Sequence, residues 1–178
     1  MKTKGLRALA CLGVLILGAA LIMGCGGGAT QAPEAPTTPT TSHFAAGGIS
    51  FDYPSAWKIL KSDDPTRIAY LSEVGTNTVV QVVTEELPDG FTLKTYHDNL
   101  AIQLMVGEPI SGNPLTVSGV TAYETVCNGE VENQDVRWRI VSLEKDGTVY
   151  DIVFSTAPDS FSKVNDDFDT VIDSFQVQ

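Results

Sequence analysis

Hydrophobic and polar residues alternate over much of the chain from residue 49 onwards, and this pattern predicts a β-sheet. Residues 49–53 alternate apolar and polar side chains, which is typical of a half-buried strand. Residues 78–84 are β-branched and apolar on both faces, so we expect them in the middle of the sheet. Similar patterns predict further strands over residues 57–60, 67–72, 120–131, 135–144 and 148–156.

Two short glycine-containing sequences bear on how the last strands connect. Asp146-Gly147 predicts a tight hairpin, because both central residues of such a turn need positive φ. Asn128-Gly129 could form a second turn, but a turn there would shorten the strand that must pair with residues 135–144. We therefore interpret Asn128-Gly129 as a bulge within one long strand.

Two segments show helical spacing of their apolar residues. Thr92 is a plausible N-cap for a first helix, and Gly107 and Pro109 end it. A second helix is expected over residues 159–174. The apolar stripes consist of Leu93, Tyr96, Leu100, Leu104 and Met105 in the first helix, and of Phe161, Val164, Phe168, Val171, Ile172 and Phe175 in the second. Antiparallel strands with two amphipathic helices predict the α+β class.

The N-terminus has the features of an export signal. Basic residues precede an apolar run over residues 8–23, which is shorter than the about 20 residues of a stable membrane span. Ile22, Met23, Gly24 and Cys25 follow in a sequence that resembles a bacterial lipobox. The resemblance implies that signal peptidase II recognises Ile22, Met23 and Gly24, and that the lipid is attached to Cys25. An uncleaved anchor is the alternative.

The resulting domain plan has three parts. Residues 1–24 form the lipoprotein signal peptide, residues 25–46 form a Gly-, Pro- and Thr-rich linker, and residues 47–178 form one globular domain. We expect this domain on the extracytoplasmic face of the cell membrane, held there by the lipid on Cys25.

Charge excludes some partners. All 22 acidic residues follow Cys25, and 8 of the 11 Lys and Arg residues remain once the signal is removed, so the mature net charge is −14. A domain this acidic repels phosphate groups, and we expect no nucleic acid partner. It also repels anionic lipid head groups, which leaves the lipid as the contact with the membrane.

Residues that could carry chemistry are few. His43 lies in the expected linker, and His97 lies beside the stripe of the first helix as a surface or boundary residue. No Gly-x-Ser-x-Gly sequence is present, so a hydrolase is poorly supported. Cys127, the one cysteine of the expected domain, is interpreted as a buried small hydrophobe rather than a reactive thiol.

One segment of the sequence partly resembles a metal-binding site. Asn165, Asp166, Asp167 and Asp169 are reminiscent of a calcium loop, but its glycine and distal glutamate are missing and the segment has helical spacing. We interpret these acids as a solvated helix face and expect no metal site and no cofactor.

Arginine and tryptophan residues complete the candidates. Trp57 and Trp138 are interpreted as core residues, whereas an exposed ring in a groove would favour ligand binding. Arg137 and Arg139 should point to the sheet face opposite Trp138. They either pair with acids such as Glu124 or Asp151, or form a small basic spot that contacts an acidic partner.

Two short motifs resemble the PsbP-like families. Residues 51–57 read Phe-Asp-Tyr-Pro-Ser-Ala-Trp, and a late hairpin with residues 150–154 leads into a helix that closes with Asp173-Ser174-Phe175. These families include the extrinsic photosystem II subunit PsbP, a Ran-binding nuclear import factor and bacterial lipoproteins. The resemblance implies a central antiparallel β-sheet flanked by helices on both faces, an α/β/α sandwich. It also implies protein binding without shared catalytic residues.

The sequence therefore predicts a membrane-tethered, extracytoplasmic lipoprotein that is a non-catalytic protein-binding or assembly module. Its expected partner is another envelope protein. The alternative is a surface lipoprotein that binds a small molecule or a metal, and a hydrolase is the third class.

Overall fold

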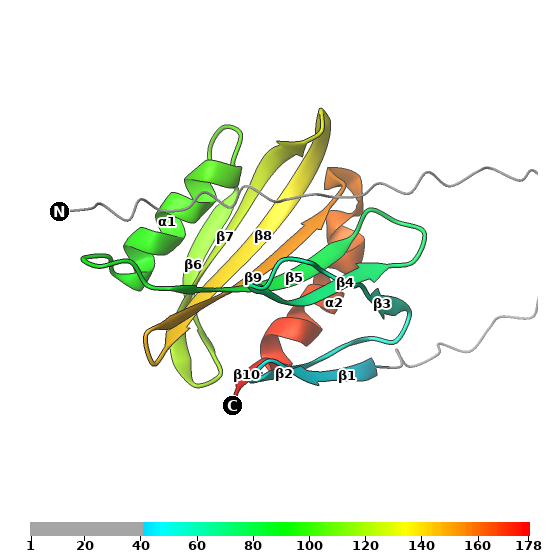
Figure 1. The fold of residues 1–178 in the computed structure, drawn as a ribbon. Coiled ribbons are helices and arrows are strands. Elements are labelled where there is room, and N and C mark those ends of the chain that lie inside the picture. The colour runs from blue at the N-terminus through cyan, green and yellow to red at the C-terminus, as the bar shows by residue number, and fades with distance from the viewer. Residues whose placement is uncertain (1–40) are drawn as a thin grey trace, which may run out of the picture.

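The main sheet is antiparallel throughout and carries both helices (Figure 1). The structure, a computed structural model, describes residues 41–178. The seven strands lie in the order β3-β4-β5-β9-β8-β7-β6. Their bounds are β3 Trp57–Ile59, β4 Arg67–Glu73, β5 Val79–Glu86, β6 Ser111–Val117, β7 Val120–Val131, β8 Gln134–Lys145 and β9 Thr148–Thr156. The expected central place of residues 78–84 is confirmed, since β5 pairs with β4 and β9.

Strands β7, β8 and β9 form two successive hairpins. Asp146 and Gly147 join β8 to β9 with φ of 55° and 82°, which confirms the predicted turn. The other turn is made by Glu132 and Asn133, with φ of 52° and 62°. This turn has no clear signal in the sequence, because neither of its two residues is a glycine.

Asn128 and Gly129 are regular strand residues, so the predicted bulge is wrong. They pair with Arg137 and Val136 in an unbroken register. Gly129 is needed for a different reason: a Cβ atom there would overlap the Trp138 indole and the backbone carbonyl of Leu104. The glycine lets the end of the first helix approach the sheet closely.

A second, three-stranded sheet has the order β1-β2-β10, with β1 Thr41–Ala46, β2 Ile49–Pro54 and β10 Gln176–Val177. Strand β1 lies within the predicted linker of residues 25–46, so folded structure begins earlier than Gly47. The buried Phe44 explains this extension, because its ring stacks on Phe51 of β2 with centroids 4.9 Å apart.

Strand β6 was not expected from the sequence. It lies at the edge of the main sheet and pairs only with β7. Most of its residues are exposed, and Pro114 lies within it. Proline cannot donate to a ladder and is tolerated on edge strands, so the usual alternation is missing.

The helices agree with the predicted stripes. Helix α1 covers Leu93–Leu104, and the Thr92 hydroxyl accepts a hydrogen bond from the backbone N–H of Thr95, as a capping residue does. Helix α2 covers Phe161–Ser174 and follows a 3₁₀ turn, η1, at Pro158–Ser160.

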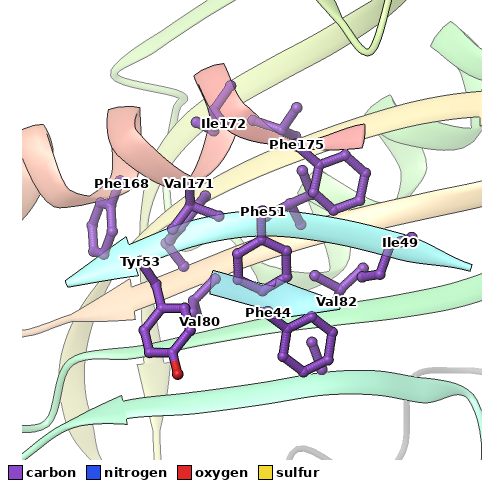
Figure 2. Packing of buried hydrophobic residues seen from close by; sticks show 14 of the residues in the cluster. Phe44, Ile49, Phe51, Tyr53, Val80, Val82, Phe168, Val171, Ile172 and Phe175 are labelled. Atoms are coloured by element: carbon purple, nitrogen blue, oxygen red, sulfur yellow. The ribbon is translucent and has the colours of Figure 1, made fainter. Parts of the chain in front are cut away.

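Alternate side chains of the central strands enter two separate cores. The larger core lies between the main sheet, α2 and the small sheet. Figure 2 shows side chains of this core from β1, β2, β5 and α2, among them Phe44, Phe51, Val80, Val82 and Phe168, together with Phe175, which directly follows α2. The smaller core lies under α1 and includes Tyr96, Leu100, Cys127, Trp138, Ile140 and Val153. One outer layer is thus part helix and part sheet, so the predicted sandwich is only partly realised.

Both tryptophans are core residues, as predicted. Trp57 is 4% exposed and packs edge-on against Phe168, with centroids 6.1 Å apart. Trp138 is 2% exposed and belongs to the core under α1. Neither ring is available as an exposed ligand platform.

Removing the Phe168 ring should destabilise the domain strongly. Its ring contacts Phe154 and Phe161 as well as Trp57, and it is fully buried. We expect Phe168→Ala to lower the free energy of unfolding by about 3–5 kcal/mol in urea titrations. Ile102→Ala on α1 is the control, since Ile102 is 63% exposed and should change stability by less than about 0.5 kcal/mol. Equal losses for the two variants would contradict the packing described.

Candidate functional site

Two clusters of polar side chains lie on opposite faces of the main sheet. The arginine cluster consists of Glu124, Arg137, Arg139, Asn165 and Asp169. The network under α1 consists of Tyr96, His97, Thr125, Ser142 and Asp151. Both interrupt strand faces that are otherwise apolar, so both are candidates for binding or catalytic chemistry.

Arg139 is the centre of the arginine cluster. Its Nε donates to Glu124 Oε1 at 2.7 Å, and its Nη1 donates to Asp169 Oδ1 at 2.7 Å and to Asn165 Oδ1 at 3.2 Å. Burial alone would lower the pKa of Arg139, but the hydrogen bonds and charges of the two carboxylates raise it. The predicted pairing with Glu124 is confirmed, while Asp151 lies on the other face. Arg139 is therefore used internally, which leaves it poorly placed to contact a partner.

Arg137 lies at the rim of the same cluster. Its Nε donates to Asn128 Oδ1 at 3.1 Å, and its guanidinium lies 5.6 Å from the centre of the Phe161 ring. Both Arg137 and Phe161 are half-buried. Of the two arginines proposed as partner contacts, Arg137 is the one that still faces outward.

The acidic face of α2 is less uniform than expected. Asp169 does not simply face solvent, because it is bound by Arg139 and by the Asn165 side-chain amide. Burial raises the pKa of Asp167, and the nearby Glu73 and Asp166 raise it further. Within residues 41–178 no group of His, Cys, Asp and Glu side chains is arranged to hold a metal ion.

His97 is buried, so its prediction as a surface or boundary residue is wrong. It is 2% exposed. Its Nδ1 lies 2.9 Å from Ser142 Oγ, and its Nε2 lies 2.9 Å from Thr125 Oγ1. Burial lowers the pKa of His97 to about 4, which keeps the imidazole neutral at physiological pH. The position of His97 next to Tyr96 on the helical stripe is compatible with burial. The sequence does not show this directly, because the hydroxyl groups that contact the imidazole ring come from Ser142 and Thr125 on distant strands.

Serine, histidine and aspartate meet in this network, but their order does not suit nucleophilic catalysis. Ser142 Oγ donates to Asp151 Oδ1 at 2.6 Å, so the serine lies between the histidine and the acid. A catalytic histidine instead lies between the two, where the acid orients it. Ser142 and Asp151 are also at most 1% exposed, which keeps substrate away from them.

Cys127 offers no alternative nucleophile. It is fully buried in the core under α1, as predicted, and burial raises the pKa of its thiol to about 11. The reactive thiolate is therefore disfavoured.

The residues predicted to direct lipidation, Ile22, Met23, Gly24 and Cys25, lie outside the described part of the chain. Among the described residues, no helix is sufficiently long and apolar to span a bilayer.

The arrangement of the sheet and helices is found in several solved structures. The cyanobacterial PsbP protein CyanoP of Synechocystis aligns with a TM-score of 0.58 and 18% identity, over 84% of this chain and 99% of that chain. The described domain has the PsbP-like fold. LpqN of Mycobacterium tuberculosis, which is involved in cell envelope biogenesis, aligns with a TM-score of 0.57 and 12% identity over 78% of this chain and 90% of its own.

A eukaryotic protein shares the PsbP-like fold too. The Ran-binding protein Mog1p of Saccharomyces cerevisiae aligns with a TM-score of 0.57 and 11% identity over 79% of this chain and 96% of its own. No family model and no curated protein matches this sequence. At these identities the likeness concerns the fold, and no residue role is transferred.

The ion pairs of Arg139 should make it a structural residue. We expect Arg139→Met to destabilise the domain by about 2–4 kcal/mol, because Glu124 would be left in a site where its side chain is only 16% exposed. Arg137→Met is the matched control and should cost less than about 1 kcal/mol. Urea titrations of the two variants test this. Similar losses in the free energy of unfolding would show that the buried ion pairs of Arg139 contribute no more to stability than the contacts of Arg137.

Proposed function

We propose that this protein is a lipid-anchored module on the extracytoplasmic face of the membrane that binds another envelope protein and catalyses no reaction. The lipobox-like sequence at Ile22, Met23, Gly24 and Cys25 supports the anchor. The non-catalytic part depends mainly on one observation: the histidine, serine and aspartate that meet in the interior are buried and are joined in an order unsuited to catalysis.

Protein binding is supported by the use of the PsbP-like fold elsewhere. Mog1p is a Ran-binding protein, and LpqN is involved in cell envelope biogenesis. Both have the fold without a close sequence relation to this chain, so the partner here is defined by its own surface chemistry. In the proposed assembly, α1 and α2 form the two outer layers of an α/β/α arrangement, and the small sheet widens the α2 layer.

The proposed contact is the rim formed by Arg137 and Phe161. Arginine is enriched among the residues that contribute most to protein interfaces, and phenylalanine is enriched in interfaces generally. On a mature chain of charge −14, a cationic site favours an acidic segment of the partner. Arg139 supports this contact indirectly, by fixing α2 to the sheet through Asp169.

Replacing Cys25, the proposed lipidation residue, should leave the protein without its lipid anchor. We expect Cys25→Ser to abolish lipid attachment, because only the thiol accepts the diacylglyceryl group. Labelled palmitate should follow the wild-type protein and not the variant. Equal labelling of the two proteins would end the lipoprotein interpretation while leaving the fold untouched.

Reversing the charge at the rim should weaken partner binding. A photoreactive amino acid at Ser162, which is exposed and follows Phe161 on α2, would report the contact in living cells without removing a partner of Arg137. We expect Arg137→Glu to reduce the cross-linked adduct about ten-fold or more, as the loss of one interface hot spot does. Lys58→Glu makes the same charge change on the exposed face of β3 and should leave the adduct unchanged. An adduct that is insensitive to Arg137→Glu would place the interface elsewhere.

A further inference from the structure

Asp151 is a carboxyl group in the centre of the main sheet, and it forms no ion pair with any residue of the described range 41–178. It is 1% exposed and lies on β9, between β5 and β8. The Tyr96 hydroxyl donates to its Oδ2 at 2.6 Å, and the Ser142 hydroxyl donates to its Oδ1 at 2.6 Å. The charged group that acts on it is Glu85 of β5, which is itself an acid. Among the residues that the structure describes, the hydrogen bonds to a negative charge here thus come from hydroxyl groups.

The hydrogen bonds continue from Asp151 across three elements. With Asp151 ionised, Thr125 donates to His97 Nε2, His97 Nδ1–H donates to Ser142, and Ser142 donates to the carboxylate. This tautomer is assigned because Ser142 has one proton and donates it to the carboxylate, so the ring nitrogen that faces Ser142 has to be the donor. Every donor then points toward Asp151. Because Tyr96 and His97 belong to α1, the network ties this helix to the sheet.

A protonated Asp151 also fits the site. Its new O–H can donate to the Tyr96 oxygen, and the Tyr96 hydroxyl can then turn to the half-buried Glu85 carboxylate, which interacts with it. One proton is taken from water, so the charge of the pair falls from −2 to −1 and the remaining charge lies on Glu85. No buried donor or acceptor is lost, and the buried negative charge beside Glu85 is removed, so the protonated state keeps the contacts of α1 at a lower desolvation cost.

We propose that this network is a pH-sensitive latch for α1: the proton bound at Asp151 keeps the helix docked on the sheet, and loss of that proton loosens it. The inference uses the described residues only and does not depend on the proposed lipid anchor or partner.

The groups that face Asp151 favour its neutral form. Burial raises the pKa of Asp151 to about 7, and Glu85 adds to this, while the hydrogen bonds of Ser142 and Tyr96 act in the opposite sense. Burial likewise raises the pKa of Tyr96, which therefore stays protonated. Other groups on this face are His97 on α1, Tyr123 on β7 and Glu144 on β8, which accepts from the Gly147 N–H. Since the pKa of His97 is about 4, it does not change charge over the same range.

The direction of the effect follows from linkage. The pKa of Asp151 is about 7 when α1 is docked and returns toward its usual value of 3.8 when opening admits water. The docked state therefore binds the proton more tightly. Its advantage is complete below the usual value and is lost as the pH rises through about 7. The helix should be most firmly held in acid.

Hydrogen exchange of the detergent-solubilised full chain would test the latch. After correction for the intrinsic exchange rate, the opening constant of α1 amides should rise on the order of 100-fold between pH 5 and pH 8, the limit for one proton with these pKa values. Amides of α2 on the other face should change much less. A pH response shared equally by α1 and α2 would mean general charge repulsion and would overturn the proposal.

Matched substitutions assign the response to Asp151. Asp151→Asn keeps the shape without the charge and should hold α1 with less than about a two-fold change over the same pH range. Asp98→Asn removes an exposed acid from the same helix, where it pairs with Lys94, and should retain the full response. A response that survives in Asp151→Asn would refute the latch.

Carboxyl ¹³C titration keeps the proposal testable if Asp151→Asn fails to fold. The Asp151 carboxyl of the wild-type protein should titrate near pH 7. Glu85→Gln should move its midpoint lower by removing a like charge, and Tyr96→Phe should move it higher by removing a donor to the carboxylate. The proposal would be overturned by a titration midpoint of Asp151 near the usual aspartate value. It would also be overturned if the pH dependence of α1 amide exchange did not shift with that midpoint in the two variants.

Discussion

The central antiparallel pairing of β5, β9 and β8 is the constraint on which the rest of the fold depends. Alternate residues of these strands point to opposite faces, and both faces are buried. Ile152 and Phe154 enter the larger core, while Val149 and Val153 enter the smaller one. A sheet that is apolar on both faces has to be covered twice. Helix α1 covers one face, and α2 with the small sheet covers the other.

The two faces are covered by different chemistry. Under α2 the contacts are aromatic and aliphatic. On the same face, Arg139 forms ion pairs with the carboxylates of Glu124 and Asp169. Under α1 the apolar core is smaller, and a buried run of hydroxyl, imidazole and carboxyl groups completes it. Buried polar groups are costly unless they are bonded, so the α1 side gains its attachment from directional bonds that require one exact placement of the helix.

The sequence was sufficient where local pattern and tertiary environment agree. The buried strands, the Thr92 cap, the Asp146-Gly147 turn and both helical stripes follow from periods and turn preferences that packing reinforces. The edge strand β6 and the early strand β1 could not be predicted in this way. Few of their residues are buried, and the strands with which they pair are not indicated by local sequence. The prediction that His97 lies at the surface is wrong for a related reason, since its hydrogen-bond partners Ser142 and Thr125 lie on strands far from it in sequence. The polar interruptions at Ser142 and Asp151, which are cross-strand neighbours, were the available signal.

The difference between the two helices has a consequence for motion. Helix α2 buries Val164, Phe168, Val171 and Ile172, whereas the buried side chains of α1 are Tyr96, His97, Leu100 and Ala101, two of which carry polar groups. Apolar burial tolerates small shifts, but hydrogen bonds are lost over fractions of an ångström. Local stability falls with the amount of buried apolar contact, so we expect α1, which packs on the smaller core, to open more readily than α2. The fold therefore combines a rigid side, built on α2 and the small sheet, with a side whose cover depends on the protonation of its own interior.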